Sequence, residues 1–213
     1  MCAQDSKMKF GVILAVLVIA LTALTAVEAA DQGEVDLKIK ARAVSLMNIE
    51  RAASDLVDIR VTRWSTEAER EALVKILVDE GNHAVAAALA NEAEAGWASF
   101  DPRGGSGSGR DPRKKALRYA REIIDGNTRE LIMITNEYIG YGSKAQAKDG
   151  SKITEYPLSF ILIKFQKDDN GGWNKGVGRM FVGAKINFDR PGGKFVIDEY
   201  PMDPVYLKDV TVK

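Results

Sequence analysis

Short segments in which apolar and charged residues alternate recur along this chain, and they constrain its fold more than any other feature. In residues 35–44 (VDLKIKARAV) the odd-numbered positions are apolar and positions 36 to 42 between them are charged. A period of two predicts a β-strand with one buried and one solvated face. The same pattern, or a short apolar run, returns in residues 55–64, 96–100, 116–124, 129–135, 156–165, 179–188, 193–200 and 204–213. In the segment 179–188, alternation places Met180, Val182, Ala184, Ile186 and Phe188 on the inner face.

The period changes from two to 3.6 within the stretch VTRWSTEAER. Thr66 and Glu69 match a capping box, T-x-x-E, in which each side chain satisfies the other residue's backbone N–H. Gly81 is placed to end this helix in the left-handed conformation, and Asn82 to cap a second, alanine-rich helix. Because the second helix has a thin apolar face, we expect a helical hairpin at about 66–94 that lies on a sheet.

Residues 116–124 fit two structures. Their apolar spacing and an upstream Asp-Pro pair fit a helix, whereas alternation and the turn at Asp125-Gly126-Asn127 fit a β-hairpin, which we favour. The strand in 156–165 is apolar on both faces, so we expect it to be covered on both sides. Together the segments predict an α+β, mostly β fold: an antiparallel meander, closed as a barrel or a sandwich, with the helical hairpin inserted after the second strand. One β-rich domain spans 30–213, with a flexible Gly/Ser loop at about 102–114.

The N-terminal residues determine the expected compartment. Two lysines precede the apolar run 10–23, and small residues follow it, which is the pattern of a secretory signal. The small residues predict a signal peptide over 1–29, cleaved between Ala29 and Ala30, and a secreted or periplasmic protein. The alternative is an uncleaved membrane anchor, and this segment is the only membrane contact that we expect.

Charge and composition exclude several classes of function. Thirty basic residues balance thirty acidic ones and no basic stripe is visible, so we expect no nucleic-acid partner. Cys2 precedes the cleavage point and His83 is the only histidine, so a zinc centre or a Cys–His pair cannot be built. The glycine-rich loop lacks the Lys-Ser/Thr ending of a P-loop, and QKDDNGGW lacks the terminal carboxylates of a calcium loop. We therefore assign no cofactor, no metal and no catalytic residue.

Four stretches carry a resemblance to known proteins: RWSTEAER, LRYARE, YPLSFILIKF and KINFDRPGGKFVIDEYPMDPVYLKDVTVK. They are similar to a family of exported bacterial proteins of unknown function, of the kind found in acidobacterial-type genomes. The similarity spans nearly the whole chain after the signal peptide. It implies export, and it brings no activity, ligand or site residue with it.

Six side chains are candidates for ligand binding: Arg63, Trp64, Trp97, Tyr138, Tyr141 and Trp173. Arg63 has the parity of the inward positions of its strand, and a buried guanidinium needs an anion or an acidic partner. The alternative is that the strand ends at Thr62 and that Arg63 pairs with Glu67 or Glu69. The aromatic residues fall at predicted strand ends, corners or loops, where such side chains can line a cleft.

Two classes of function remain open. We favour a non-enzymatic binding or interaction module of the cell envelope, which would hold a small apolar or anionic ligand or a protein partner. The alternative is an envelope hydrolase that uses carboxylates alone, with two acidic side chains in one cleft and at least one raised pKa. On the first hypothesis, Arg63→Ala abolishes binding of an acidic ligand and leaves the fold intact; unfolding would instead make Arg63 structural.

Overall fold

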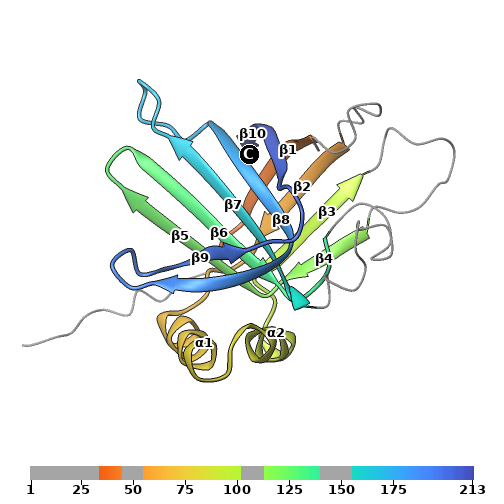
Figure 1. The fold of residues 1–213 in the computed structure, drawn as a ribbon. Helices are drawn as coiled ribbons and strands as arrows, with labels where there is room; N and C mark the ends of the chain where they lie inside the picture. The colour runs from red at the N-terminus through yellow and green to blue at the C-terminus, as the bar shows by residue number, and fades with distance from the viewer. Residues whose placement is uncertain (1–33, 45–54, 102–112, 140–154) are drawn as a thin grey trace, which may run out of the picture. The chain divides into compact units, whose positions relative to one another are not determined.

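The computed structural model describes residues 34–44, 55–101, 113–139 and 155–213, which form a mostly β fold with two helices (Figure 1). Its elements are β1 (Leu37–Val44), β2 (Asp55–Val61), α1 (Glu67–Glu80), α2 (Asn82–Asn91), β3 (Gly96–Asp101), β4 (Arg113–Leu117), β5 (Tyr119–Asp125), β6 (Thr128–Thr135), β7 (Leu158–Gln166), β8 (Lys175–Asp189), β9 (Lys194–Glu199) and β10 (Val205–Val212). The predicted signal peptide 1–29 lies outside the described residues. So does the Gly/Ser loop up to residue 112, while Arg113 and Lys114 belong to β4.

The strands form an antiparallel, nearly closed barrel. Their order is β4-β3-β2-β1-β10-β8-β7-β6-β5, with β9 paired to β8 alone. The two strands at the ends of this order, β4 and β5, are consecutive in the chain and separated only by Arg118. One continuous segment therefore pairs with β3 through its first half and with β6 through its second half. The structure thus decides between the barrel and the sandwich, and residues 116–124 are strand except for Arg118, as we favoured.

The segment between β2 and α1 adds hydrogen bonds at the place where the two ends of the sheet meet. The backbone N–H of Ser65 donates to the Ala120 carbonyl (2.7 Å), and the Ser65 hydroxyl accepts from the Ala120 N–H (3.1 Å). The chain after β2 thereby pairs with β5, next to the place where Gly96 of β3 pairs with Leu117 of β4. Gly96, the first residue of β3, has a φ of +153°, and a Cβ there would lie 2.0 Å from the Arg60 carbonyl oxygen. Only glycine allows this approach.

Apolar side chains from the strands fill the interior of the barrel. This inner core is almost entirely aliphatic, and its members include Ile39, Ile59, Val61, Leu131, Met133, Ile161, Ile163, Phe165, Met180 and Leu207. Successive inward positions supply it, as the period of two predicts.

A second core lies on the outer face of β5–β8, beneath the helical hairpin. Leu73 and Leu77 of α1 and Val85 and Leu89 of α2 are buried there. They pack with Tyr119, Ile132, Ile134, Leu158, Phe160, Phe181, Ala184, Ile186 and Phe195. The predictions that the hairpin lies on a sheet, and that the segment 156–165 is covered on both faces, are confirmed.

The predicted inner face of β8 is wrong beyond its middle. Met180 and Val182 lie in the inner core, but Ala184 and Ile186 pack in the outer core beneath the hairpin. The cause is a bulge: the register between β7 and β8 shifts by one residue, and Gly183 has a φ of +74°. An extra residue reverses the parity of everything after it.

The hairpin forms largely as predicted, with two corrections. The capping box is present: the Thr66 N–H donates to Glu69 Oε2 (2.7 Å), and the Glu69 N–H donates to Thr66 Oγ1 (3.2 Å). Gly81 ends α1 with a φ of +84°, but its ψ of −172° is extended rather than left-handed helical. Asn82 does not cap α2. Its side-chain amide donates to the Ile186 carbonyl (3.1 Å) and accepts from the Ile186 N–H (2.7 Å), which fixes the turn between the helices to β8.

Candidate functional site

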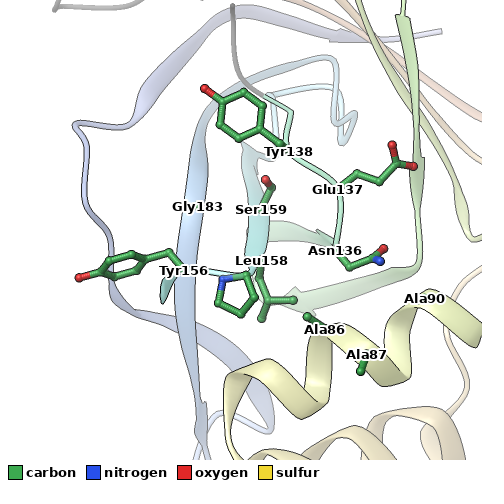
Figure 2. A pocket seen from close by; sticks show the side chains of 11 residues that line it. Ala86, Ala87, Ala90, Asn136, Glu137, Tyr138, Tyr156, Leu158, Ser159 and Gly183 are labelled. Atoms are coloured by element: carbon green, nitrogen blue, oxygen red, sulfur yellow. The ribbon is translucent and has the colours of Figure 1, made fainter. Parts of the chain in front are cut away.

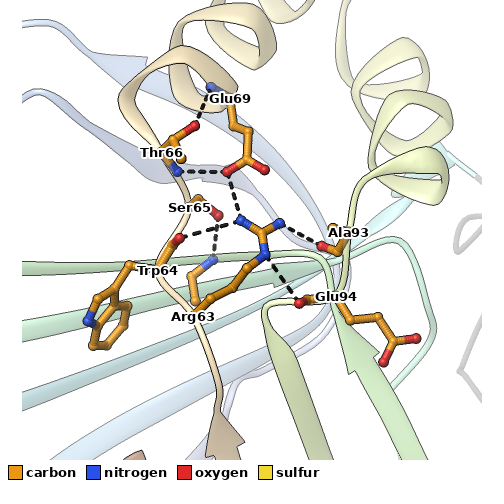
Figure 3. Close-up of polar contacts among 8 residues, drawn as sticks. Arg63, Trp64, Ser65, Thr66, Glu69, Ala93 and Glu94 are labelled. Carbon is orange, nitrogen blue, oxygen red and sulfur yellow. Dashed lines mark hydrogen bonds and ion pairs between the residues drawn. The ribbon is translucent and has the colours of Figure 1, made fainter. Parts of the chain in front are cut away.

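Arg63 lies where β2, the start of α1 and the chain leaving α2 meet (Figure 3). Its guanidinium donates to Glu69 Oε2 (2.9 Å), to the Ala93 carbonyl (2.8 Å) and to the Glu94 carbonyl (3.3 Å). A longer contact reaches the Trp64 carbonyl (3.4 Å). Its charge is therefore met by groups of its own chain, among them one of the two acidic partners that the sequence suggested. A role in binding a ligand stays a prediction.

The partner of Arg63 is a charged carboxylate. Burial raises the pKa of Glu69, but the hydrogen bonds from Arg63 and from the Thr66 backbone N–H outweigh it and hold the pKa below its ordinary value. Glu69 thus serves the capping box and the ion pair together. This arrangement ties the first turn of α1 to the end of the hairpin.

The predicted aromatic site residues do not gather in one place. Trp64, Tyr138 and Trp173 are each half-buried and pack against the inner core. Trp97 lies on the outer face of β3, where the Lys114 ammonium sits 4.6 Å from the centroid of its ring. Tyr141 lies outside the described residues. Of these five residues, Tyr138 alone lines the pocket described next.

A pocket of about 390 Å³ lies between α2, the end of β6 and the start of β7 (Figure 2). Its lining consists of Ala86, Ala87, Ala90, Asn136, Glu137, Tyr138, Tyr156, Pro157, Leu158, Ser159 and Gly183. The alanines of α2 form one wall and leave room, because they carry only a methyl group. Figure 2 shows Asn136 and Glu137 on one side of the pocket, across from Leu158 and Ser159. Apolar and hydrogen-bonding surfaces thus face the same space.

Local sequence explains why the chain opens here. The buried Thr135 hydroxyl at the end of β6 accepts a hydrogen bond from the Glu137 N–H (3.0 Å), which turns the backbone out of the strand. Pro157 precedes β7 and has no N–H to offer a neighbouring strand. On the far wall, Gly183 lies at the bulge where the register between β7 and β8 shifts by one residue.

Glu137 is the acidic residue in the pocket lining, and two hydrogen bonds hold its carboxylate in place. Its Oε2 accepts from the Lys115 ammonium (2.8 Å) and its Oε1 from the Ala116 N–H (3.2 Å). Burial raises the pKa of Glu137, but the hydrogen bonds from Lys115 and from the Ala116 N–H outweigh this effect and hold the pKa below its ordinary value. The group is therefore a carboxylate at neutral pH. Burial raises the pKa of Tyr138, which keeps its phenol neutral. A two-carboxylate hydrolase requires a second acid and a raised carboxyl pKa, and the residues that line this pocket supply neither.

Two further observations concern the described part of the chain. Within it, no three His, Cys, Asp or Glu side chains stand close enough to hold a metal ion. None of the helices in the described ranges has the length and apolar character needed to cross a bilayer.

Sequence reasoning missed most of this pocket. The sequence predicted only an alanine-rich helix with a thin apolar face, and gave no role to Ala86, Ala87 and Ala90, although small residues on a helix that covers a sheet also leave space. Asn136 and Glu137 directly follow the strand 129–135, so the signal available was a polar pair at a strand end. Glu137 meets Lys115 because the register of the β5–β6 hairpin, in which Tyr119 pairs with Ile134, places Glu137 opposite Ala116.

Comparison of the whole chain with protein-family models, with curated proteins and with solved structures found no match in any of the three. The resemblance to exported bacterial proteins stays a prediction, and the site has to be interpreted from its own chemistry.

Proposed function

We propose that this protein is a non-enzymatic binding module of the cell envelope, exported by its N-terminal signal, and that its ligand lies in the pocket beside α2. The observation that carries the proposal is the combination in that pocket of a small-residue wall with an anchored carboxylate and an amide. Ligand pockets are typically apolar clefts of several hundred Å³ with a few placed polar groups. A volume of about 390 Å³ fits that description.

The lining favours one class of ligand over the other. An anionic ligand would lie beside the negatively charged Glu137 carboxylate. The nearby Lys115 ammonium already pairs with that carboxylate. A small ligand with an apolar body and a hydrogen-bond donor would place the body against Leu158 and the alanines of α2. Its donor would reach the lone pairs of Glu137 or the Asn136 amide oxygen. We therefore propose an uncharged, mainly apolar molecule.

The position of the carboxylate supports binding rather than catalysis. Glu137 is held by two hydrogen bonds and stays charged, so it is suited to orienting a donor and unsuited to giving up a proton. A general acid at neutral pH would need a raised pKa instead.

Native mass spectrometry of the protein purified from its own host tests the proposal. The expected result is a co-purifying small molecule that the Ala90→Phe variant loses, because the added ring fills the pocket from an exposed helix position. Ala72→Phe is the matched control, since it places the same ring on an exposed position of α1 away from the pocket. Retention of the molecule by both variants would place its site elsewhere, and its absence from the unmodified protein would contradict tight binding.

A further inference from the structure

Three adjacent strands of the barrel present basic side chains on their outer face. We call this set the basic face: Lys38, Lys40 and Arg42 of β1, Lys208 of β10, and Lys175 and Arg179 of β8, all exposed. Arg42 lies directly opposite Lys208, and Thr211 stands between Lys40 and Lys175 in the register. No described element packs over these strands, and Figure 1 shows both helices away from β1 and β10.

Half of the basic face has no acidic partner among the described residues. Lys38 pairs with Asp36 (2.9 Å), Lys40 with Asp58 (3.5 Å) and Arg42 with Asp209 (3.8 Å). No ion pair within the described ranges holds Lys175, Arg179 or Lys208. Like charges opposite each other, such as Arg42 and Lys208, destabilise a sheet. The face is therefore not arranged for the stability of the barrel alone.

Acidic residues are concentrated in the helical hairpin instead. Between residues 67 and 94 the acidic side chains are Glu67, Glu69, Glu71, Asp79, Glu80, Glu92 and Glu94, and the basic ones are Arg70 and Lys75. A chain with no formal net charge thus folds into a molecule with a basic and an acidic region. A charged surface would attract one region and repel the other, and would so orient the protein.

We propose that the basic face docks the protein on the anionic headgroups of a lipid bilayer. The complementary partner must be negatively charged and must meet cations spread over three strands rather than collected in a pocket. Val177 lies between Lys175 and Arg179 on the same face and is 66% exposed, which offers an apolar contact that a bilayer accepts. The signal or anchor that the sequence predicts at 10–23 would bring the chain to a membrane.

The aromatic residues near the basic face distinguish a bilayer from single-stranded nucleic acid. Proteins that bind single strands stack bases on free aromatic faces. Here the Arg179 guanidinium lies 5.8 Å from the ring centroid of Tyr206, the aromatic residue of β10. Because a cation covers this ring, electrostatic attraction to headgroups is the better match.

Partitioning of the full chain between water and vesicles tests the inference. One set of vesicles is phosphatidylcholine alone, and the other is phosphatidylcholine and phosphatidylglycerol in equal parts. The ratio of the two partition coefficients cancels what the run 10–23 contributes to both. At low ionic strength we expect a ratio of about a hundred, from the three cations that have no partner in the described ranges, at roughly fivefold each. In about 1 M salt, where the screening length is about 3 Å, the ratio should fall close to one.

Two doubly substituted chains distinguish an effect of the basic face from an effect of the net charge of the protein. Lys175→Glu with Lys208→Glu should lower the ratio by about thirtyfold or more. Lys75→Glu with Arg190→Glu makes the same change in net charge at exposed positions off the face, and should lower the ratio by less than about threefold. Equal loss in both, or no preference of the unmodified chain for anionic vesicles, overturns the inference. Tighter binding to a single-stranded oligonucleotide assigns a nucleic acid instead, and salt-sensitive self-association without vesicles assigns a second copy.

Discussion

The outer face of the barrel has two halves. They share one inner core, and they differ in their outward side chains and in what covers those side chains. On β5–β7 the outward positions that lie beneath the helical hairpin are apolar. On β1, β10 and the first part of β8 most of them are charged, and no described helix covers them. β8 belongs to both halves: Arg179 points outward and is exposed, whereas Phe181, before the bulge at Gly183, and Ala184, after it, lie in the outer core. The helices therefore pack where the outward side chains of the strands are apolar, although the barrel itself continues beyond them.

The largest effect should come from removing a ring under the hairpin. Phe160→Ala takes away a fully buried side chain from the covered half, and we expect a loss of about 3–5 kcal/mol in the free energy of unfolding. Urea denaturation followed by circular dichroism measures it. If this variant does not fold, Phe160→Leu gives a smaller loss in the same direction.

The bare half supplies the control for this experiment. Arg179→Ala, at an outward position of the neighbouring strand, should change stability by less than about 0.5 kcal/mol. Similar losses in both variants would show that the two halves do not differ in their contribution to folding.

A smaller effect is expected at the polar base of the hairpin. Arg63→Ala removes the donor to two backbone carbonyls and to Glu69, and Arg63 is only 23% exposed, so we expect a loss of about 1–3 kcal/mol. Arg60→Ala is the matched control. Arg60 lies in β2, three residues before Arg63, but is 41% exposed and pairs with Asp36 at the surface, so we expect a loss below about 1 kcal/mol. If thermal unfolding of the Arg63 variant is unchanged while an acidic ligand no longer binds, the ligand hypothesis is right and the structural one is wrong.

The parts of this fold that obey a local period could be predicted from the sequence. Alternation placed the strands, and the capping box at Thr66 and Glu69 placed the start of α1. The segment 116–124 was decided correctly by the turn after it. Predictions failed where one residue changes the register or replaces a cap: the bulge at Gly183 reversed the parity of Ala184 and Ile186, and Asn82 bound a strand instead of its helix.

The two proposed sites depend on contacts between distant residues, which no period reveals. Glu137 and Lys115 meet because the exact register of the β5–β6 hairpin carries on into β4 and places Glu137 opposite Ala116. The basic face is hidden in the sequence for a related reason: balanced composition says nothing about segregation, and strands far apart in the chain bring Lys40 and Lys175 to the same side. Charge counts alone therefore could not exclude a basic surface.

The smallest effect at neutral pH is expected at a hydroxyl within the covered half. Tyr119 is 1% exposed, its ring packs edge-on against Phe195, and its hydroxyl makes no hydrogen bond among the described residues. A buried polar atom without a partner is destabilising, so Tyr119→Phe should stabilise the protein by about 1 kcal/mol at neutral pH. Thermal unfolding at fixed pH measures the change.

The same substitution should act more strongly in alkali. Burial raises the pKa of Tyr119 to about 12, although the charge of Arg121 nearby opposes the rise. The unfolded chain ionises this phenol near its ordinary pKa of about 10, so the unmodified protein is at full stability below that pH and loses roughly 2–3 kcal/mol as the pH rises through about 12. Tyr119→Phe removes this loss. Tyr200→Phe, at a half-exposed ring, should leave the alkaline unfolding curve unchanged. If the Tyr119 and Tyr200 variants respond alike, the hydroxyl under the hairpin is hydrated in solution, and the covered half is less dry than its packing indicates.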